Sequence, residues 1–271
     1  MDDFLSHIEV RLQSAFGSNT LLSQTGGHLC LASGAKRVRP LLTAYFGSAL
    51  NIPAQDIIPF AISSELIHSA SLLHDDVVDA GEMRRGRPTV NAQWSNSVAV
   101  LSGNHLLSLA LRELKPYSPA ITQEAISVVD EMTRAAILEL QMRNSKVHTI
   151  DDWRLMATGK TGSLFAFCGT SVALYAGDNF AAQAFKQAGH HIGTVFQLVD
   201  DLSDLQEDLK NLEGSYPRLL SLNGHTEPVD ACKAELRVQA ALAFESLGKW
   251  RDTEGGQQIK IWLDQLSCFA S

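Results

Sequence analysis

The sequence lacks several features that would assign it to a familiar class. It has only four cysteines and no Cys-x-x-Cys pair, so neither a zinc site nor a disulfide framework is expected, and reduced core thiols are predicted. No uninterrupted apolar run is long enough to span a bilayer, and the start, Met1-Asp2-Asp3-Phe4, is acidic where a secretory signal would be basic. The net charge of -8 argues against nonspecific binding of nucleic acid. We therefore expect a soluble, cytoplasmic protein with no nucleic-acid partner and no transmembrane segment.

Short-period repeats and low-complexity tracts are also missing, and alternating β-branched runs are few. The 271 residues are 45% hydrophobic and 19% charged, which is enough to bury one sizeable core, so we predict a single domain over residues 1–271. Helical periodicity dominates, and the eight prolines fall mainly at plausible helix boundaries. We predict an all-α fold with helices over residues 3–16, 38–50, 56–79, 91–112, 119–144, 150–176, 179–208, 215–223, 229–247 and 256–269.

The chain does contain an aspartate pair followed by a third aspartate, and it contains this pattern twice. The two copies are Asp75-Asp76-Val77-Val78-Asp79 and Asp200-Asp201-Leu202-Ser203-Asp204. Helical spacing aligns Asp75 and Asp79 with His68, and it aligns Asp201 with Gln197. A single copy is typical of a solvated helix end. Two copies, each following an apolar run, indicate a function.

Carboxylates gathered in this way raise one another's pKa and oppose folding unless a cation neutralises them. A hard divalent ion that also binds water and phosphate oxygens is the simplest remedy, and the absence of an Asp-x-Asp-x-Asp-Gly loop argues against calcium. Helical bundles build such sites from side chains on facing helices. We therefore predict a magnesium site shared with a substrate, with the two aspartate groups facing each other across a cleft.

Basic residues form two clusters in this acidic chain. Arginine offers a fork of donors suited to phosphate, and lysine offers a compact charge. Together with the aspartate groups, the clusters favour a substrate whose diphosphate is held by metal, and a second anion held by lysine and arginine. The clusters are Lys36, Arg37 and Arg39, and Arg84, Arg85 and Arg87.

These motifs occur in an order that resembles the trans-polyprenyl diphosphate synthases, and most closely their long-chain, octaprenyl-diphosphate-synthase-like members. The resemblance covers roughly residues 30 to 220. It implies an isoprenoid-synthase-type helical bundle with a central cavity, usually a homodimer, with a heteromer as the alternative. The residues that carry it are Gly34-Ala35-Lys36-Arg37-Val38-Arg39-Pro40, Glu65-Leu66-Ile67-His68, Leu73-His74-Asp75-Asp76-Val77-Val78-Asp79, Arg84-Arg85-Gly86-Arg87-Pro88-Thr89, Lys160-Thr161-Gly162-Ser163-Leu164-Phe165 and Phe196-Gln197-Leu198-Val199-Asp200-Asp201.

The resemblance further implies a head-to-tail condensation, in which an allylic diphosphate ionises and isopentenyl diphosphate attacks the allylic cation. Three magnesium ions per active site are expected, with Asp75, Asp79, Asp200 and Asp204 as ligands and Asp76 and Asp201 as ligands or support. The allylic diphosphate is assigned to Arg84, Lys160, Thr161 and Gln197. Isopentenyl diphosphate is assigned to Lys36, Arg39, His68 and Arg85.

Product length depends on the residues that precede the first aspartate group. The small side chains of Ala70 and Ser71 would leave a tunnel open for a long chain, whereas Leu66 and Ile67, one turn deeper, could close it. A short-chain synthase of the farnesyl or geranylgeranyl type therefore stays open as an alternative.

The largest departure from the family pattern follows Asp204, where a Gly-Lys loop is usual and this chain continues to Lys210 and Gly214 as if a segment were deleted. Loss of a lid there would slow the reaction or admit water. Two further alternatives thus remain at the level of sequence: a weak or non-catalytic subunit of a heteromeric synthase, and a terpene cyclase, which has no need for Lys36, Arg39 and His68.

Overall fold

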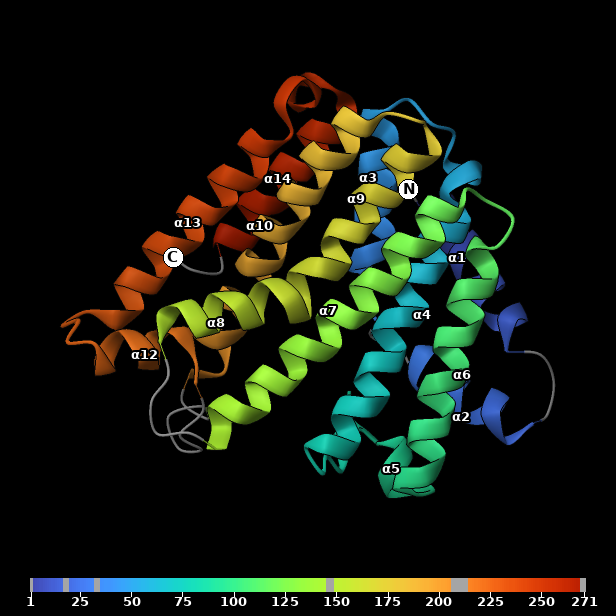
Figure 1. Ribbon diagram of the computed structural model, residues 1–271, viewed down its shortest axis with the longest axis horizontal. Coiled ribbons are helices and arrows are strands. Elements are labelled where there is room, and N and C mark those ends of the chain that lie inside the picture. Colours follow the sequence, from blue (N-terminus) through green and yellow to red (C-terminus); the bar gives the residue numbers. More distant parts are fainter. Residues whose placement is uncertain (1, 17–19, 32–34, 145–148, 206–213, 269–271) are drawn as a thin grey trace. The chain divides into compact units, whose positions relative to one another are not determined.

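The structure is a computed structural model that describes residues 2–16, 20–31, 35–144, 149–205 and 214–268. Helices make up almost all of these residues, and the strands among them are the two-residue pair β1 (Met83–Arg84) and β2 (Arg87–Pro88), which is antiparallel (Figure 1). The predicted all-α fold class is confirmed. The chain divides into two compact units, Met1–Ala44 with Ile52–Thr122, and Tyr45–Asn51 with Gln123–Ser271. A single domain over residues 1–271 stays a prediction.

The first unit is organised around α4 (Ala54–Val78), a helix of 25 residues that runs beside α6 (Asn96–Leu114) (Figure 1). Its apolar side chains, including Phe60, Leu66 and Leu73, are almost fully buried and form the core of this unit. The remaining helices that pack on α4 within the unit are α1 (Asp2–Ala15), α2 (Leu21–Cys30) and α5 (Val90–Gln93). The first residues of α3 (Val38–Ala49) also belong to this unit.

The second unit is organised around α10 (Asn179–Ser203), which packs against α9 (Ser163–Tyr175) and α13 (Pro228–Ser246). Gly189 and Gly193 make this packing close, because a Cβ atom at either position would overlap the backbone of Ala166 or Gly162. The other elements are most of α7 (Pro119–Asn144), α8 (Ile150–Ala157), the π-helical turn Thr158–Gly162, α12 (Tyr216–Leu222), the 3-10 turn Gly248–Asp252 and α14 (Glu254–Cys268).

Most predicted helices are found within a few residues of their expected bounds, but the helix predicted over 150–176 is interrupted by the π-helical turn Thr158–Gly162, and three further differences occur. Helix α2 was not predicted, since it carries two adjacent glycines; it begins at a cap in which the Thr20 hydroxyl accepts from the Ser23 amide. The helix predicted over 91–112 is wrong as one element, because Ser95 caps a new helix after α5 ends. The helix predicted over 179–208 ends at Ser203, and residues 206–208 lie outside the described part of the chain.

The short hairpin is a further difference from the sequence-based prediction. Arg85 and Gly86 have φ values of 51° and 74°, so both turn residues adopt the left-handed region. Two consecutive positive φ values are typical of the tight turn that matches the twist of a hairpin. Only Gly86 signals such a turn in the sequence, because an arginine rarely takes this conformation.

The four cysteines are free thiols, three of them buried, as the sequence predicted for core thiols, whereas Cys268 is exposed. Burial raises the pKa of Cys30 to about 11 and the pKa of Cys232 to about 12, so both are protonated at neutral pH. No helix in the described ranges is both long enough and apolar enough to cross a membrane.

Candidate active-site residues in the two units

The first aspartate group lies at the C-terminal end of α4. Asp75 and Asp76 occupy the last turn, and Asp79 is the C-cap residue, whose amide donates to the carbonyl oxygen of Asp75 at 2.8 Å. A helix C-terminus carries partial negative charge, so three carboxylates there repel both one another and the helix dipole. Cations near the helix end would offset this charge.

One cation in the structure meets this need. Arg84 of the hairpin donates to Oδ1 of the buried Asp76 from Nε at 2.9 Å and from Nη2 at 2.7 Å. The Oδ2 atom of Asp76 is buried and has no hydrogen-bond partner among the described residues. An acceptor left in this way fits a bound cation, because an unpaired buried carboxylate oxygen is costly. Arg84, which the sequence assigned to a diphosphate, thus supports an aspartate.

A cluster of arginines surrounds His68, which lies two turns before Asp75 on α4. Desolvation holds the pKa of His68 well below its usual value, and the charges of nearby arginines lower it further. The imidazole is therefore neutral at pH 7 and can donate one hydrogen bond to an anion. The arginines concerned, in order of effect, are Arg39, Arg85, Arg84 and Arg37.

Three of the four residues assigned to isopentenyl diphosphate, namely Arg39, His68 and Arg85, are thus brought into one electrostatic neighbourhood of the first unit. The fourth, Lys36, is exposed and lies just before the first turn of α3, where Arg39 is found. Concentrated positive charge around a neutral histidine is suited to a diphosphate, which accepts charge-assisted hydrogen bonds from several donors.

The second aspartate group lies at the C-terminal end of α10, so the same electrostatic argument applies. Asp200 and Asp204 are exposed, and the amide of Asp204 donates to the carbonyl oxygen of Asp200 at 2.9 Å. Asp201 is buried and accepts hydrogen bonds on both carboxylate oxygens. The donors are Gln197 Nε2 at 3.0 Å, Trp153 Nε1 at 2.9 Å and the Tyr216 amide at 2.7 Å.

These bonds tie the end of α10 to α8 and α12. Because both oxygens of Asp201 accept hydrogen bonds, the geometry favours a supporting role for this residue. Sequence analysis missed Trp153, since a tryptophan in an amphipathic helix is typical of a core position. The ring of Trp153 also packs against Tyr216, with centroids 4.6 Å apart.

The π-helical turn between α8 and α9 carries two residues assigned to the allylic diphosphate. The Thr161 hydroxyl donates to Gln197 Oε1 at 3.2 Å, so both residues belong to the hydrogen-bonded chain that ends at Asp201. Lys160 is paired with Glu139 of α7, with 2.5 Å between Nζ and Oε2. Such turns often occur at functional sites. Glu139 is a second residue to which the sequence assigned no role.

The residues expected to control product length lie within the first unit. Leu66, Ile67 and Ala70 are buried, and the Ser71 hydroxyl donates to the carbonyl oxygen of His68 at 2.9 Å. All four precede Asp75 on α4, with Ser71 and Ala70 about one turn away and Ile67 and Leu66 about one turn further. A tunnel beneath the first aspartate group stays a prediction.

Within the described residues, no three histidine, cysteine, aspartate or glutamate side chains come together as a metal site of their own. The donor set is nevertheless all carboxylate oxygen, which suits magnesium. The two aspartate groups belong to different units, so their facing each other stays a prediction. Lys210 and the shortened segment around it lie outside the described residues.

Residues 19–216 match the family model described as polyprenyl synthetase. An octaprenyl diphosphate synthase of Haemophilus influenzae is 35% identical over 249 residues, which cover 89% of this chain and 72% of that protein. An all-trans-nonaprenyl-diphosphate synthase (geranyl-diphosphate specific) of Rhodobacter capsulatus is 35% identical over 185 residues, which cover 66% of this chain and only 56% of that protein.

Among solved structures, a decaprenyl diphosphate synthase from Rhodobacter capsulatus superposes with a TM-score of 0.91 at 21% identity, covering 100% of this chain and 97% of that one. A heptaprenyl diphosphate synthase from Staphylococcus aureus gives a TM-score of 0.89 at 24% identity, covering 98% of each chain. At these identities the structural likeness establishes the fold alone.

Proposed function

The chain belongs to the polyprenyl synthetase family, and we propose that it condenses isopentenyl diphosphate with an allylic diphosphate to make a long-chain trans-polyprenyl diphosphate. The observation that carries this proposal is the placement of both aspartate groups at electronegative helix ends, where Arg84 pairs with Asp76 in the first group and Gln197 donates to Asp201 in the second. Such a pattern opposes folding unless the residues bind a metal ion and an anion together.

In the proposed reaction the carbon–oxygen bond of the allylic diphosphate breaks and diphosphate leaves. The double bond of isopentenyl diphosphate then attacks the allylic carbon, a carbon–carbon bond forms, and a proton is lost. Bound magnesium, three ions per site, supplies positive charge to the leaving diphosphate. The residues that would hold these ions are Asp75, Asp79, Asp200 and Asp204, with Asp76 and Asp201 as ligands or support.

The remaining site residues bind and orient the two substrates. The allylic diphosphate would be held by Lys160, Thr161, Gln197 and Arg84. The hydrogen bonds from Thr161 to Gln197 and from Gln197 to Asp201 would fix the positions of these side chains relative to one another. Lys36, Arg39, His68 and Arg85 would hold isopentenyl diphosphate. Correct placement of the two substrates relative to each other contributes much of the rate acceleration in a reaction of this kind.

A long product is favoured by the small side chains at Ala70 and Ser71. The octaprenyl and nonaprenyl synthases are relatives at 35% identity and support the same choice. In the short-chain alternative, Leu66 or Ile67 closes the tunnel. The length of the product distinguishes this alternative from a long-chain synthase.

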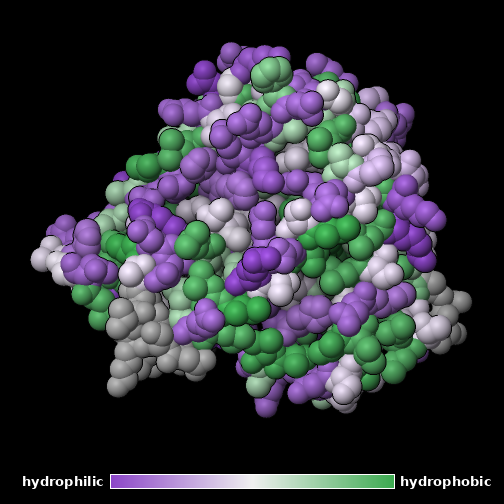
Figure 2. Space-filling model, in the orientation of Figure 1, coloured by the Kyte–Doolittle hydropathy of each residue, from purple (hydrophilic) through white to green (hydrophobic). Residues whose placement is uncertain are grey.

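Assembly and location complete the proposal. Figure 2 shows hydrophobic side chains reaching the surface at several places on one face, and exposed apolar residues include Ile126 and Ile137 of α7. We propose that two copies of the chain associate as a homodimer and cover apolar positions of this kind. Free cysteines support a cytoplasmic location, where thiols stay reduced.

The test is release of inorganic diphosphate by the purified chain. Release should require an allylic diphosphate, isopentenyl diphosphate and magnesium together, and it should stop when a chelator removes the metal. Release from the allylic substrate alone would indicate a cyclase or a hydrolase. Binding of a non-ionising allylic diphosphate analogue without any release would indicate a non-catalytic subunit.

A further inference from the structure

Arg37 is a buried arginine in an uncommon backbone conformation, next to residues assigned to isopentenyl diphosphate. It is 6% exposed, and its φ of 48° lies in the left-handed region that favours glycine. Its carbonyl oxygen accepts from the Leu41 amide at 3.0 Å, so Arg37 is where α3 starts. A strained residue of this kind persists only when its surroundings fix it.

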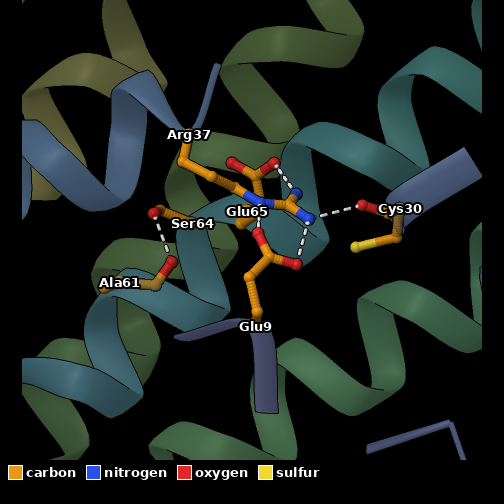
Figure 3. A network of polar contacts seen from close by, with 6 residues as sticks. All are labelled: Glu9, Cys30, Arg37, Ala61, Ser64 and Glu65. Atoms are coloured by element: carbon orange, nitrogen blue, oxygen red, sulfur yellow. Dashed lines mark hydrogen bonds and ion pairs between the residues drawn. The ribbon is translucent and has the colours of Figure 1, made fainter. Parts of the chain in front are cut away.

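The guanidinium of Arg37 is fixed from three helices (Figure 3). Glu9 of α1 accepts from Nε at 2.5 Å and from Nη2 at 3.0 Å. Glu65 of α4 accepts from Nη1 at 2.5 Å, and the carbonyl oxygen of Cys30, the last residue of α2, accepts from Nη2 at 2.8 Å. Although burial lowers the pKa of Arg37, the hydrogen bond to Glu9 and the charge of Glu65 raise it above its usual range. The side chain is therefore a permanent cation, and four of its five N–H donors have a partner.

These contacts connect the two helices that carry the predicted anion-binding residues. Arg39 lies two residues beyond Arg37, in the first turn of α3. Glu65 lies three residues before His68 on α4, so the two side chains share one face of that helix. One planar guanidinium thus fixes the start of α3 against the turn of α4 that leads to His68.

We propose that Arg37 is a positioning residue, which sets the distance between Arg39 and His68 and so shapes the site for isopentenyl diphosphate without touching it. This inference rests on the proposed function. Lysine cannot replace arginine in this part, since an ammonium group cannot form the planar fork that binds Glu9 and Glu65 together.

The experiment compares the purified wild-type chain with Arg37→Lys, which keeps the positive charge, and with Arg11→Gln as control. Arg11 pairs with Glu113 at 2.9 Å and so also attaches α1 to another helix of the first unit; the control removes this one contact of α1 and leaves Arg37 and its partners in place. Binding of isopentenyl diphosphate, and separately of a non-ionising allylic diphosphate analogue with magnesium, is measured by calorimetry. Circular dichroism verifies that each variant is folded.

For Arg37→Lys we expect the affinity for isopentenyl diphosphate to fall about tenfold or more. A displacement of Arg39 or His68 by about 1 Å is enough for a loss of this size. Binding of the allylic analogue should stay within about twofold, and Arg11→Gln should bind both ligands as the wild type does. In turnover, the KM for isopentenyl diphosphate should rise with little change in kcat.

Equal loss of both ligands in Arg37→Lys would mean a general structural role and would overturn the inference, as would unchanged binding of isopentenyl diphosphate. If Arg37→Lys does not fold, Glu9→Gln replaces it, since Glu9 is 42% exposed and glutamine keeps one acceptor oxygen. That variant should weaken binding of isopentenyl diphosphate selectively, and wild-type affinity would overturn the inference. A wild-type chain that binds no isopentenyl diphosphate would contradict the proposed function and this inference together.

Discussion

Asp75 lies in the last turn of α4, where its carboxylate adds to the negative charge of the helix end. In Asp75→Ala we expect condensation to be abolished, because a metal ligand is lost. The free energy of unfolding should change by no more than about 1 kcal/mol, or should rise, because repulsion among carboxylates is relieved. Diphosphate release and urea unfolding measure the two effects. Unchanged turnover would contradict the magnesium assignment.

Trp153 donates from its indole nitrogen to the buried carboxylate of Asp201. Trp153→Phe keeps an aromatic ring but removes this donor, so we expect a loss of about 2 kcal/mol in the free energy of unfolding, the usual value for a hydrogen bond to a charged group. The magnesium concentration needed for half-maximal turnover should also rise, since Asp201 holds the end of α10.

Trp250→Phe is the matched control for this prediction, because Trp250 is also buried and packs against Phe185 at a centroid distance of 5.2 Å. It should lower stability by packing loss without changing the magnesium requirement. An equal shift of the magnesium requirement in both variants would mean that Trp153 acts only through packing.

Among the helices, the contact of α10 with the π-helical turn depends on Gly193. A methyl group there would overlap the backbone of Gly162, which cannot move away as a side chain could. Gly193→Ala should therefore cost about 2 kcal/mol or more of stability. It should also impair binding of the allylic diphosphate analogue, because Thr161 lies beside Gly162 in the same turn.

Gly27→Ala is the comparison for this substitution. Among the described residues, a Cβ atom at Gly27 would meet Leu31 Cδ1 alone, at 3.7 Å, an ordinary contact, so alanine should stabilise α2 by up to about 1 kcal/mol. Urea unfolding of both variants measures the difference. Similar stabilities for the two alanine variants would contradict the close approach of α10 to the turn.

The regular helices could be predicted from the sequence, whereas the irregular elements could not. Helices such as α4 and α7 were predicted because their apolar residues recur at helical spacing and their ends carry proline or aspartate. The π-helical turn was not, since Thr158–Gly162 continues the helical pattern on both sides. The arginine at the hairpin turn and the two glycines of α2 contradict ordinary residue preferences, so tertiary contacts decide those elements.

In the candidate site, too, residues set by local helical spacing were predicted, and residues that act through tertiary contacts were not. The aspartates and His68 were predicted from spacing, because they lie on single helices. Glu65, Glu139 and Trp153 were missed, since each acts on a residue far away in the chain and a single sequence contains no record of such contacts. Local periodicity therefore indicates candidate site residues, and the structure adds the residues that contact them.

For the molecule as a whole, the free energy of unfolding should depend on pH through His190, a half-buried histidine that is neutral in the folded state. Desolvation, together with the nearby charges of Lys186 and His191, lowers the pKa of His190 to about 4. The unfolded chain binds a proton at this residue near its ordinary pKa of about 6.5, so stability is complete above that value and is lost as the pH falls toward 4. This residue alone gives a slope of at most about 1.4 kcal/mol per pH unit.

The measurement is urea unfolding at about pH 7 and about pH 5 for the wild type, His190→Gln and His225→Gln. His190→Gln should lose less stability on acidification than the wild type. His225 is exposed and serves as the control for replacing a histidine. An identical pH dependence in the wild type and His190→Gln would contradict the neutral state of His190.

The central claim concerns the reaction itself, and the most direct measurement incubates the purified chain alone with labelled isopentenyl diphosphate, farnesyl diphosphate and magnesium. The extracted prenols are then resolved by length. We expect long-chain products, which would agree with the small side chains at Ala70 and Ser71. Products that contain only one or two added isopentenyl units would indicate that Ile67 or Leu66 closes the tunnel. No product from a folded chain that binds the allylic analogue would contradict the account of a self-sufficient synthase.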